Sequence, residues 1–390
     1  MLALTRELVR AGHAVRMVAP PDFGAQVEAT GAEHVPIGTS MRAFMQRMAG
    51  PLQLGGLAFM RAMYRFGVVS LREQCRLLPE AARGMDRILT AGTIVAAGSA
   101  AKLHGIPFRA VAYTPAVLPS PESSPALFPL QLRSPVGNRL LWWAALGSLQ
   151  ATLRPALERQ RRALGLPPID DLPREVLSPR PLLAADAPLA PAPRSCPLAP
   201  ETIRCLHPLR GDPLPPKLEA FLQAGPPPVY LGFGSMPDPD PRSTTARLLA
   251  ALSQLGCRAV LSSGWAGLGE GALPEGVEVV GSVSHAELFP RMAAVVHHGG
   301  AGTTHTAARS GVPQIVIPHV LDQFYFARRV HDLGVSPPAL PRKRLRVDQL
   351  VATVRATLDN ELLRQRAQEL QSRLAELGPV VPDLERVLAP

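Results

Sequence analysis

The sequence is poor in lysine and in cysteine, and it has no long apolar run. It contains three lysines, Lys102, Lys217 and Lys343, so that 38 of its 41 basic residues are arginine. The 4 cysteines form no CxxC pair, and this argues against a disulfide framework or a cysteine-based metal site. The longest apolar run, from Leu140 to Leu146, is far shorter than the ~20 residues that cross a bilayer. These absences leave an ordinary globular protein as the expected class.

A surplus of positive charge is the one compositional feature that suggests a polyanionic partner. Lys+Arg 41 against Asp+Glu 31 gives a formal net charge of +10. The basic residues are scattered, however, and the densest cluster, Arg342-Lys343-Arg344, indicates a solvated loop or helix face. We therefore expect no nucleic-acid partner. The surplus charge is expected to help attract a smaller anion such as a nucleotide diphosphate.

The length and the apolar content set the expected number of domains. A chain of 390 residues is long enough for two or three domains, and 46% hydrophobic against 18% charged residues excludes disorder as the dominant state. The first ten residues show no signal-peptide pattern. We expect a cytoplasmic protein whose only membrane interaction would be peripheral.

The second half of the chain alternates β-branched runs with amphipathic stretches, which is typical of parallel βαβ units. Strands are predicted over residues 229–233, 258–261, 277–280, 294–298 and 314–317. Helices are predicted over residues 243–255, 286–292, 302–310, 323–333, 347–358 and 361–377. This order predicts one doubly wound domain.

The first half shows a weaker form of the same alternation. Strands are predicted over 14–18, 93–97 and 108–113, and helices over 2–10, 99–104 and 136–164. Residues 186–216 hold nine prolines, a density that breaks helices and sheets, and they are predicted to connect the domains. The expected fold class is α/β, with two Rossmann-like, doubly wound parallel-sheet domains. Their predicted limits are residues 1–200 and 201–378, followed by a terminal segment, 379–390.

The segment that most clearly suggests a ligand-binding site is VVHHGGAGTT, residues 295–304. A buried strand enters a glycine-rich turn, and a helix begins directly after it. A helix N-terminus offers unpaired N–H groups and a positive dipole end, and glycines allow an anion to approach the backbone. The glycine spacing is not GxGxxG, and on spacing alone a structural tight turn is as good an interpretation as a phosphate site. The same absence of GxGxxG disfavours an NAD-dependent oxidoreductase.

Other loops follow strands at the same predicted edge of the sheet. Asp322 and Gln323 follow the last strand, where a carboxylate and an amide can bind sugar hydroxyls, although Asp322 can instead cap the next helix. Ser235 lies in a GFGSM loop, and Trp265 lies in an SSGW loop. The Trp265 ring offers a flat surface for a nucleobase, the alternative being a partly buried aromatic residue.

The run HHGGAGTTHTAARSGVPQIVIPHVLDQFYFARRVHDLG, residues 297–334, closely resembles the donor-binding motif of family 1 GT-B glycosyltransferases. The GFGSM and SSGW loops resemble the same family, as does AYTPAVLP at residues 112–119. The nearest relatives are expected among bacterial enzymes that glycosylate macrolides, other natural products or sterols. The resemblance implies a GT-B fold, in which two Rossmann-like domains face each other across a cleft and the final helix crosses back to the first domain.

The resemblance also implies roles for individual residues. The donor diphosphate would be bound by the serine-loop residue, the histidine and the turn that follows it: Ser235, His298, Gly299, Gly300, Gly302 and Thr303. Trp265 would lie near the nucleobase, and Asp322 and Gln323 would hold the donor sugar. The implied reaction inverts the anomeric centre and transfers the sugar of a UDP- or TDP-sugar to a hydroxyl of a small, mostly apolar acceptor. It needs no metal or cofactor. Because neighbouring strand residues face opposite ways, His297 and His298 are not expected to bind one metal ion.

One part of the family pattern is not found, namely a strand and loop ahead of residues 1–10 that carry the general base. His13 is no substitute, because it lies at the far end of the predicted first helix. We therefore expect that Met1 is an internal methionine and that the catalytic base lies upstream of it. The alternative hypothesis is a truncated or degenerate relative that binds a donor or a partner transferase without efficient catalysis.

Overall fold

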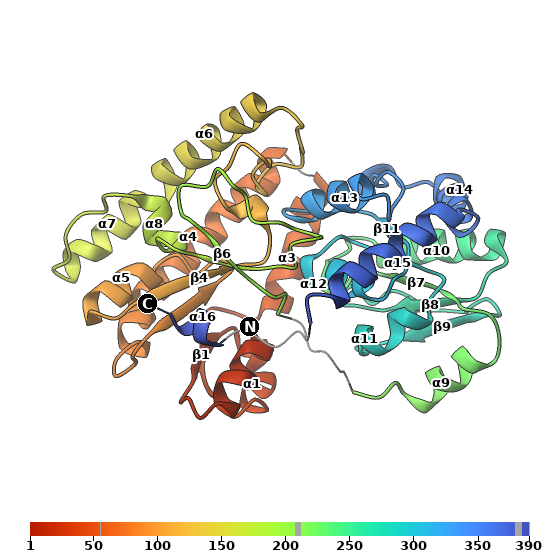
Figure 1. Cartoon of the computed structure of the whole chain (residues 1–390), viewed down its shortest axis with the longest axis horizontal. Coiled ribbons are helices and arrows are strands. Elements are labelled where there is room, and N and C mark those ends of the chain that lie inside the picture. Colours follow the sequence, from red (N-terminus) through yellow and green to blue (C-terminus); the bar gives the residue numbers. More distant parts are fainter. Residues whose placement is uncertain (55, 207–211, 379–383, 390) are drawn as a thin grey trace.

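The computed structural model describes residues 1–390 except 55, 207–211, 379–383 and 390, and the side chains of 52–60 and 63 are not described either. Two α/β parts lie side by side, the first in red to green and the second in green to blue (Figure 1). All strand pairs in the described residues are parallel. In the same residues, no helix is both long and apolar enough to cross a membrane.

The second part is built on a five-stranded sheet with the order β11-β10-β7-β8-β9. Its strands are β7 Val229–Gly232, β8 Ala259–Ser262, β9 Val277–Val280, β10 Ala294–His297 and β11 Gln314–Val316. Its helices are α9 Pro216–Gln223, α10 Pro241–Leu255, α11 His285–Leu288, α12 Ala301–Arg309, α13 Gln323–Asp332, α14 Val347–Leu358 and α15 Glu361–Ala375. The strands and helices predicted for this half are confirmed, with ends that shift by a few residues.

The sheet of the second part is covered on both faces by apolar clusters. On one face Leu231 packs with Leu248 of α10 and Val354 of α14. On the other face Tyr230 packs with Leu218 of α9 and Phe289 after α11. Neighbouring strand residues therefore point to opposite layers, and β7, β8 and β10 are fully buried, as expected for central parallel strands.

The first part has its strands in two separate sheets. One sheet has the order β3-β4-β5-β6, and the other is the pair β1-β2. The strands are β1 Arg16–Ala19, β2 Glu33–Pro36, β3 Ile88–Ala91, β4 Phe108–Ala112, β5 Leu182–Ala184 and β6 Glu201–Ile203. The helices are α1 Leu2–Arg10, α2 Gly24–Glu28, α3 Met41–Leu54, α4 Gly56–Ala81, α5 Ala97–His104, α6 Pro135–Thr152, α7 Arg154–Ala163 and α8 Leu172–Leu177.

Two predictions for the first part were wrong. The strand predicted over 93–97 is β3 at Ile88–Ala91, and residues 93–96 lie in the loop that leads to α5. The single helix predicted over 136–164 is divided into α6 and α7. Pro155 stands in the first turn of α7, where a missing N–H costs nothing, and this position favours a new helix start.

The predicted boundary at residue 200 and the predicted connection over 186–216 also need correction. Leu189, Ala190 and Leu198 are buried, and β6 pairs with β5 in the first sheet. Three residues without proline, Glu201 to Ile203, are enough to add an edge strand to this sheet. The first part therefore extends to at least Leu206, which packs against its core, and Leu214 already packs in the core of the second part.

The end of the chain returns to the first part. Helix α16, Leu384–Leu388, lies beside β1 and α1 in Figure 1. Its Val387 is fully buried among Leu4, Leu8 and Val111. Arg109 donates a hydrogen bond of 2.7 Å to the Arg386 carbonyl. The last described helix is therefore part of the core of the first domain.

Candidate functional site

The turn between β10 and α12 is held in place by His297. Gly299 N–H donates to His297 Nδ1 at 3.0 Å, so the ring proton lies on Nε2, which donates to Gln314 Oε1 at 2.9 Å. Burial, followed by the nearby His298, lowers the pKa of His297 to about 3. This histidine is thus a neutral structural residue, and both of its ring nitrogens are engaged.

His298 points elsewhere, as the alternation of strand residues predicts. Its ring is nearly perpendicular to that of His297, at 83°, with the ring centroids 6.5 Å apart. The Nδ1 atom of His298 is buried and has no hydrogen-bond partner. Burial, followed by the charge of His285, lowers the pKa of His298 to about 4. A buried polar atom without a partner is costly in a native protein, and a bound ligand would supply the missing hydrogen bond.

The N-terminus of α12 lies beside the His298 ring. The N–H of Thr304 is the first in this helix to bond within it, to Gly300 O at 2.9 Å. The N–H groups of the preceding helix residues therefore have no acceptor within the helix. A Cβ atom on Gly300 would overlap His298 Nε2, which shows how closely the ring lies against the turn. Gly302 is exposed and Thr303 is half-buried, so both are accessible to an anion.

The loops that follow β7 and β8 meet at the same place. Gly234 has a φ of +58°, and a Cβ atom there would lie 3.3 Å from His298 Cε1. Trp265 N–H donates to Gly234 O at 2.9 Å, so the Ser235 and Trp265 loops are in direct contact. Ser235 and Trp265 are both half-buried. The structure thus gathers three separate predicted loops around His298.

The loop that follows β11 completes the arrangement. Asp322 stands at the N-cap position of α13, but its side chain makes no capping hydrogen bond. The structure therefore does not support the alternative role of Asp322, which was to cap α13 with its carboxylate. Burial raises the pKa of Asp322 to about 6. The preceding residue, Leu321, has a φ of +53°, which is uncommon for a non-glycine residue and is often found at functional loops.

Gln323 differs from its predicted partner Asp322. Its side chain is buried, and Oε1 accepts hydrogen bonds from His319 N–H at 2.7 Å and Val320 N–H at 3.0 Å. Its Nε2 donates to Met236 Sδ at 3.2 Å. Through these bonds the Gln323 amide holds the loop that precedes Asp322 and links it to the loop that bears Ser235.

Sequence reasoning missed a polar group that supports these loops from behind. Arg342 Nε donates to His319 Nε2 at 3.0 Å, and the same guanidinium forms an ion pair with Asp238. Burial, followed by Arg342, lowers the pKa of His319 to about 3. The 342–344 cluster was predicted to be solvated, which holds for Lys343 and Arg344 but not for Arg342. No local signal separates Arg342 from its neighbours, because its partners lie far away in the sequence.

The first domain contacts the second through α12 and α13. Asp186, which is fully buried after β5, accepts hydrogen bonds from Arg204 at 2.8 Å and from Arg309 at the end of α12. Asp186 N–H donates to His305 Nε2 at 3.2 Å. Burial alone would raise the pKa of Asp186, but the charges around it, Arg309 first, outweigh this and hold the pKa below its usual value.

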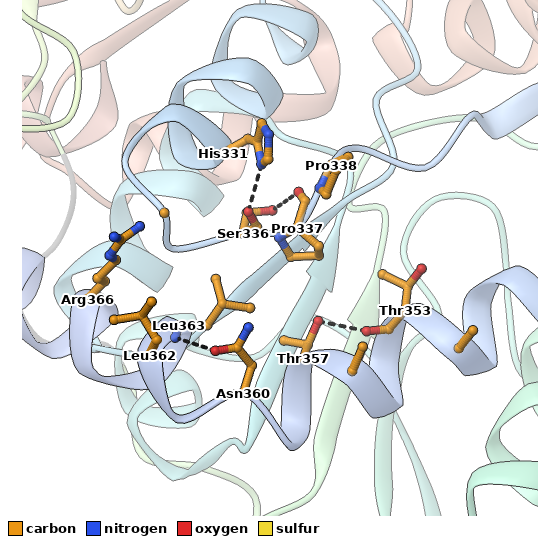
Figure 2. A pocket seen from close by; sticks show the side chains of 13 residues that line it. His331, Ser336, Pro337, Pro338, Thr353, Thr357, Asn360, Leu362, Leu363 and Arg366 are labelled. Carbon is orange, nitrogen blue, oxygen red and sulfur yellow. Dashed lines mark hydrogen bonds between the residues drawn. The ribbon is translucent and has the colours of Figure 1, made fainter.

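A separate hollow of about 520 Å³ lies between α13, α14 and α15 (Figure 2). Its polar groups already bond to the chain: His331 donates to Ser336 O at 3.1 Å, and Thr357 donates to Thr353 O at 2.8 Å. Asn360 Oδ1 accepts from Leu363 N–H at 3.0 Å. These groups do not converge on a common point, so this hollow is a weaker candidate for a ligand-binding site than the loops around His298.

The fold and the loops around His298 together define a class of protein. It is an α/β protein of two parts, in which a helix N-terminus suited to binding an anion lies at the carboxyl ends of parallel strands. Comparison with known proteins then identifies the family. Residues 246–385 match the family described as erythromycin biosynthesis protein CIII-like, C-terminal domain.

Two relatives from Amycolatopsis orientalis match most of the chain. Vancomycin aglycone glucosyltransferase is 39% identical over 343 residues, covering 86% of this chain and 81% of the relative. Glycosyltransferase GtfE is 38% identical over 344 residues, with the same two coverages. The solved structure of the kitacinnamycin glycotransferase has a TM-score of 0.71 and 25% identity, and covers 97% of this chain and 92% of that one. The chain belongs to the family 1 glycosyltransferases of the GT-B fold.

Proposed function

We propose that this glycosyltransferase binds a UDP- or TDP-sugar in the loop cluster around His298 and transfers the sugar, with inversion, to a hydroxyl of a small, mostly apolar acceptor. The acceptor classes in view are natural products, sterols and lipid-like molecules. The observation that carries the proposal is the unpartnered, buried His298 Nδ1 beside the open N-terminus of α12.

The proposed contacts follow from the geometry of the loops. The diphosphate would accept hydrogen bonds from His298, from the N–H groups of Gly299, Gly300, Gly302 and Thr303, and from Ser235. Charge-assisted hydrogen bonds of this kind are the strong ones, and the positive end of the helix dipole adds to them. Trp265 would stack on the base. The ionised Asp322 would accept hydrogen bonds from sugar hydroxyls, with Gln323 as its loop partner. The binding mode requires no metal and no cofactor.

The names of relatives agree with this donor and acceptor chemistry. A 35% identical relative from Amycolatopsis orientalis is a dTDP-epi-vancosaminyltransferase, and a 30% identical relative from Arabidopsis thaliana is a sterol 3-beta-glucosyltransferase. The first name supports a TDP-sugar donor for the present chain, and the second supports a small apolar acceptor.

A second candidate function is a relative that binds a donor, or a partner transferase, without efficient catalysis. The observation that favours it is the division of the first-domain sheet between β1 and β3. In this candidate the donor loops of the second domain are retained and turnover is weak or absent.

Titration of the purified protein with UDP, TDP and their hexose conjugates, followed by tryptophan fluorescence, tests the donor site. We expect a His298→Ala variant to lose roughly 10–100-fold in affinity, because one hydrogen bond to a charged group contributes about 1.5–3 kcal/mol. The matched control is His13→Ala, since His13 is exposed and lies in the other domain. Failure of both nucleotides to bind the unchanged protein would contradict the proposal.

A turnover assay with a panel of hydroxyl acceptors then separates the two candidates. Product formation, with inversion at the anomeric carbon read by NMR, supports the transferase. Donor binding without product formation across the panel supports the second candidate.

A further inference from the structure

Helix α6 of the first domain presents an apolar face to solvent. Of the twelve large apolar side chains that are exposed in the described residues, six lie between residues 127 and 149. On α6 itself the exposed apolar residues recur at helical spacing and form one stripe, which consists of Val136, Leu140, Trp143, Ala144, Gly147 and Ala151. A contiguous apolar patch on a protein surface marks a place of contact with a partner or a membrane.

The opposite face of α6 is bonded to its own domain. Trp142 is buried, and its Nε1–H donates to Ser123 O at 2.9 Å. Asn138 is buried as well, and its Nδ2 donates to Pro121 O at 2.9 Å. The neighbouring Trp143 is 78% exposed. Because α6 cannot rotate without breaking these bonds, the stripe stays on the outside.

The segment that carries the stripe is strongly basic. Residues 123–163, which include α6 and α7, contain six arginines and one acidic residue, Glu158. Their net charge of +5 is half of the +10 of the whole chain. Three of the six, Arg139 on α6 and Arg159 and Arg162 on α7, are exposed and form no ion pair within the described residues. The stripe is therefore accompanied by positive charge that the described residues do not neutralise.

The position of α6 suits contact with an extended surface. The helix lies along the upper edge of the first domain, and α7 continues that edge (Figure 1). Its 18 residues give it a length of about 27 Å. Since no helix in the described residues is long and apolar enough to cross a membrane, α6 could contact a bilayer only by lying on it.

From these observations we propose that the α6 stripe binds the surface of an anionic phospholipid bilayer. The helix lies in the plane of the interface, with Leu140 and Trp143 among the upper parts of the acyl chains and Arg139 beside the phosphate groups. Tryptophan is enriched at this depth of a bilayer, and each arginine near an anionic surface adds to the attraction.

The charge of the segment disfavours a second copy of this chain as the partner. Two α6 helices packed on each other would bring their arginines together, and α6 contains no Asp or Glu to pair with them. The stripe lies on the first domain, whereas the loops around His298 lie on the second, so this proposal does not rest on the proposed function.

The test is co-sedimentation of the full chain with vesicles of phosphatidylcholine alone and of phosphatidylcholine mixed with phosphatidylglycerol. We expect binding to the mixed vesicles, roughly 10-fold or more weaker binding to phosphatidylcholine alone, and weaker binding at high salt, because salt screens the attraction. Trp143→Glu should weaken binding to the mixed vesicles roughly 10-fold or more, because it places a negative charge in the stripe. The matched control is Leu362→Glu, a substitution at a 54% exposed residue of α15 in the second domain.

The arginine is tested in the same way. Arg139→Glu should weaken binding to the mixed vesicles roughly 10-fold, with Arg373→Glu on the exposed surface of α15 as its control. All of these residues are exposed, so thermal unfolding of the variants should match that of the unchanged protein.

Fluorescence reports whether the stripe itself enters the lipid. We expect tryptophan emission to shift to shorter wavelength with mixed vesicles. Trp143→Phe should lose this shift and still sediment with the vesicles, since it keeps an aromatic ring. The proposal would be overturned by equal binding to both kinds of vesicle, or by equal effects of Trp143→Glu and Leu362→Glu. An absence of binding to either vesicle would overturn it in favour of a protein partner. An oligomer that Trp143→Glu dissociates without vesicles would assign the stripe to a second copy of the chain.

Discussion

His297 and His298 are neighbours in the chain but differ in what their rings contact. The first fixes the glycine turn through two hydrogen bonds, and the second leaves a buried nitrogen unpartnered beside the helix N-terminus. Burial is the largest cause of the lowered pKa in both, so both are neutral at pH 7. A neutral His298 can still donate one hydrogen bond to an anion, and a bound diphosphate would raise the pKa of this residue.

Gly300 is the residue whose substitution most directly tests the position of the His298 ring. We expect Gly300→Ala to lower donor affinity by about 10-fold, which corresponds to about 1.4 kcal/mol, because the new methyl group would displace the ring. The backbone φ of Gly300 is −64°, which alanine adopts without strain, so any loss of stability would come from the displaced ring alone. Calorimetric titration with UDP and TDP measures the effect. Gly281→Ala is the control, because a Cβ there meets nothing within 4 Å; an equal affinity in both variants would refute the expectation.

The raised pKa of Asp322 leads us to expect that the stability of the protein depends on pH. Its folded-state pKa of about 6 lies above the ordinary 3.8, so its ionisation opposes folding above pH 6. We expect Asp322→Asn to raise stability at pH 7.5 by up to about 3 kcal/mol, and this gain should fade as the pH falls from 6 towards 4. Urea unfolding at several pH values measures the gain.

The same variant should discriminate between ligands. Affinity for the nucleotide sugar should fall about 10-fold, the equivalent of about 1.4 kcal/mol, whereas affinity for the free nucleotide should not change. Asp212→Asn, in an exposed loop, is the matched control. A loss of affinity for the free nucleotide as well would place Asp322 outside the sugar-binding part of the site.

The position of each candidate site residue could be predicted from local sequence, but the state of each side chain could not. The glycine turn and the loops after β7, β8 and β11 all follow strands, and carboxyl ends of parallel strands meet at one edge. In contrast, the bond of Gln323 to Met236 and the ion pair of Arg342 with Asp238 depend on partners far away in the sequence. Such contacts leave no periodic or compositional pattern.

At the scale of elements, the second domain was more predictable than the first for a physical reason. Its strands are buried on both faces and read as short apolar runs between helices with clear periodicity. β2 and β5 were missed because Glu33–Pro36 is polar and half-exposed, and Leu182–Ala184 is only three residues long. The strand β3 was placed five residues too late, because Thr93 to Ala97 carries the stronger β-branched signal.

The anchoring of α12 by Asp186 gives an element-scale prediction. We expect Asp186→Asn to destabilise the protein by about 3–5 kcal/mol, because Arg204 and Arg309 would lose a buried partner. In the unchanged protein the pKa of Asp186 is lowered, so this stabilisation is present near pH 7 and is lost as the pH falls through that pKa. Thermal unfolding at pH 7 measures the loss. Asp332→Asn, which breaks more exposed ion pairs with Arg133 and Arg328, should cost less than about 1 kcal/mol; equal losses would contradict a structural role for Asp186.

At the scale of the whole molecule, the return of α16 makes the last residues part of the first core. Val387→Asp would place an unpaired carboxylate among Leu4, Leu8 and Val111, and we expect it to destabilise the first domain by about 3 kcal/mol or more. The proposed donor site lies in the other domain, so donor affinity should be retained at temperatures where that domain stays folded. Limited proteolysis with donor titration measures both effects. Glu385→Ala on the same helix, exposed to solvent, is the control, and unchanged protease resistance of Val387→Asp would refute the expectation.

One arginine bonds the ends of the two domains together. Arg204, just after β6, donates to Leu377 O at 2.5 Å and to Gly378 O at 2.8 Å. The same side chain donates to Asp186, which also forms an ion pair with Arg309 of α12. The end of the second domain and its helix α12 are therefore joined to the same edge of the first-domain sheet, so that replacing Arg204 would release two contacts between the domains at once.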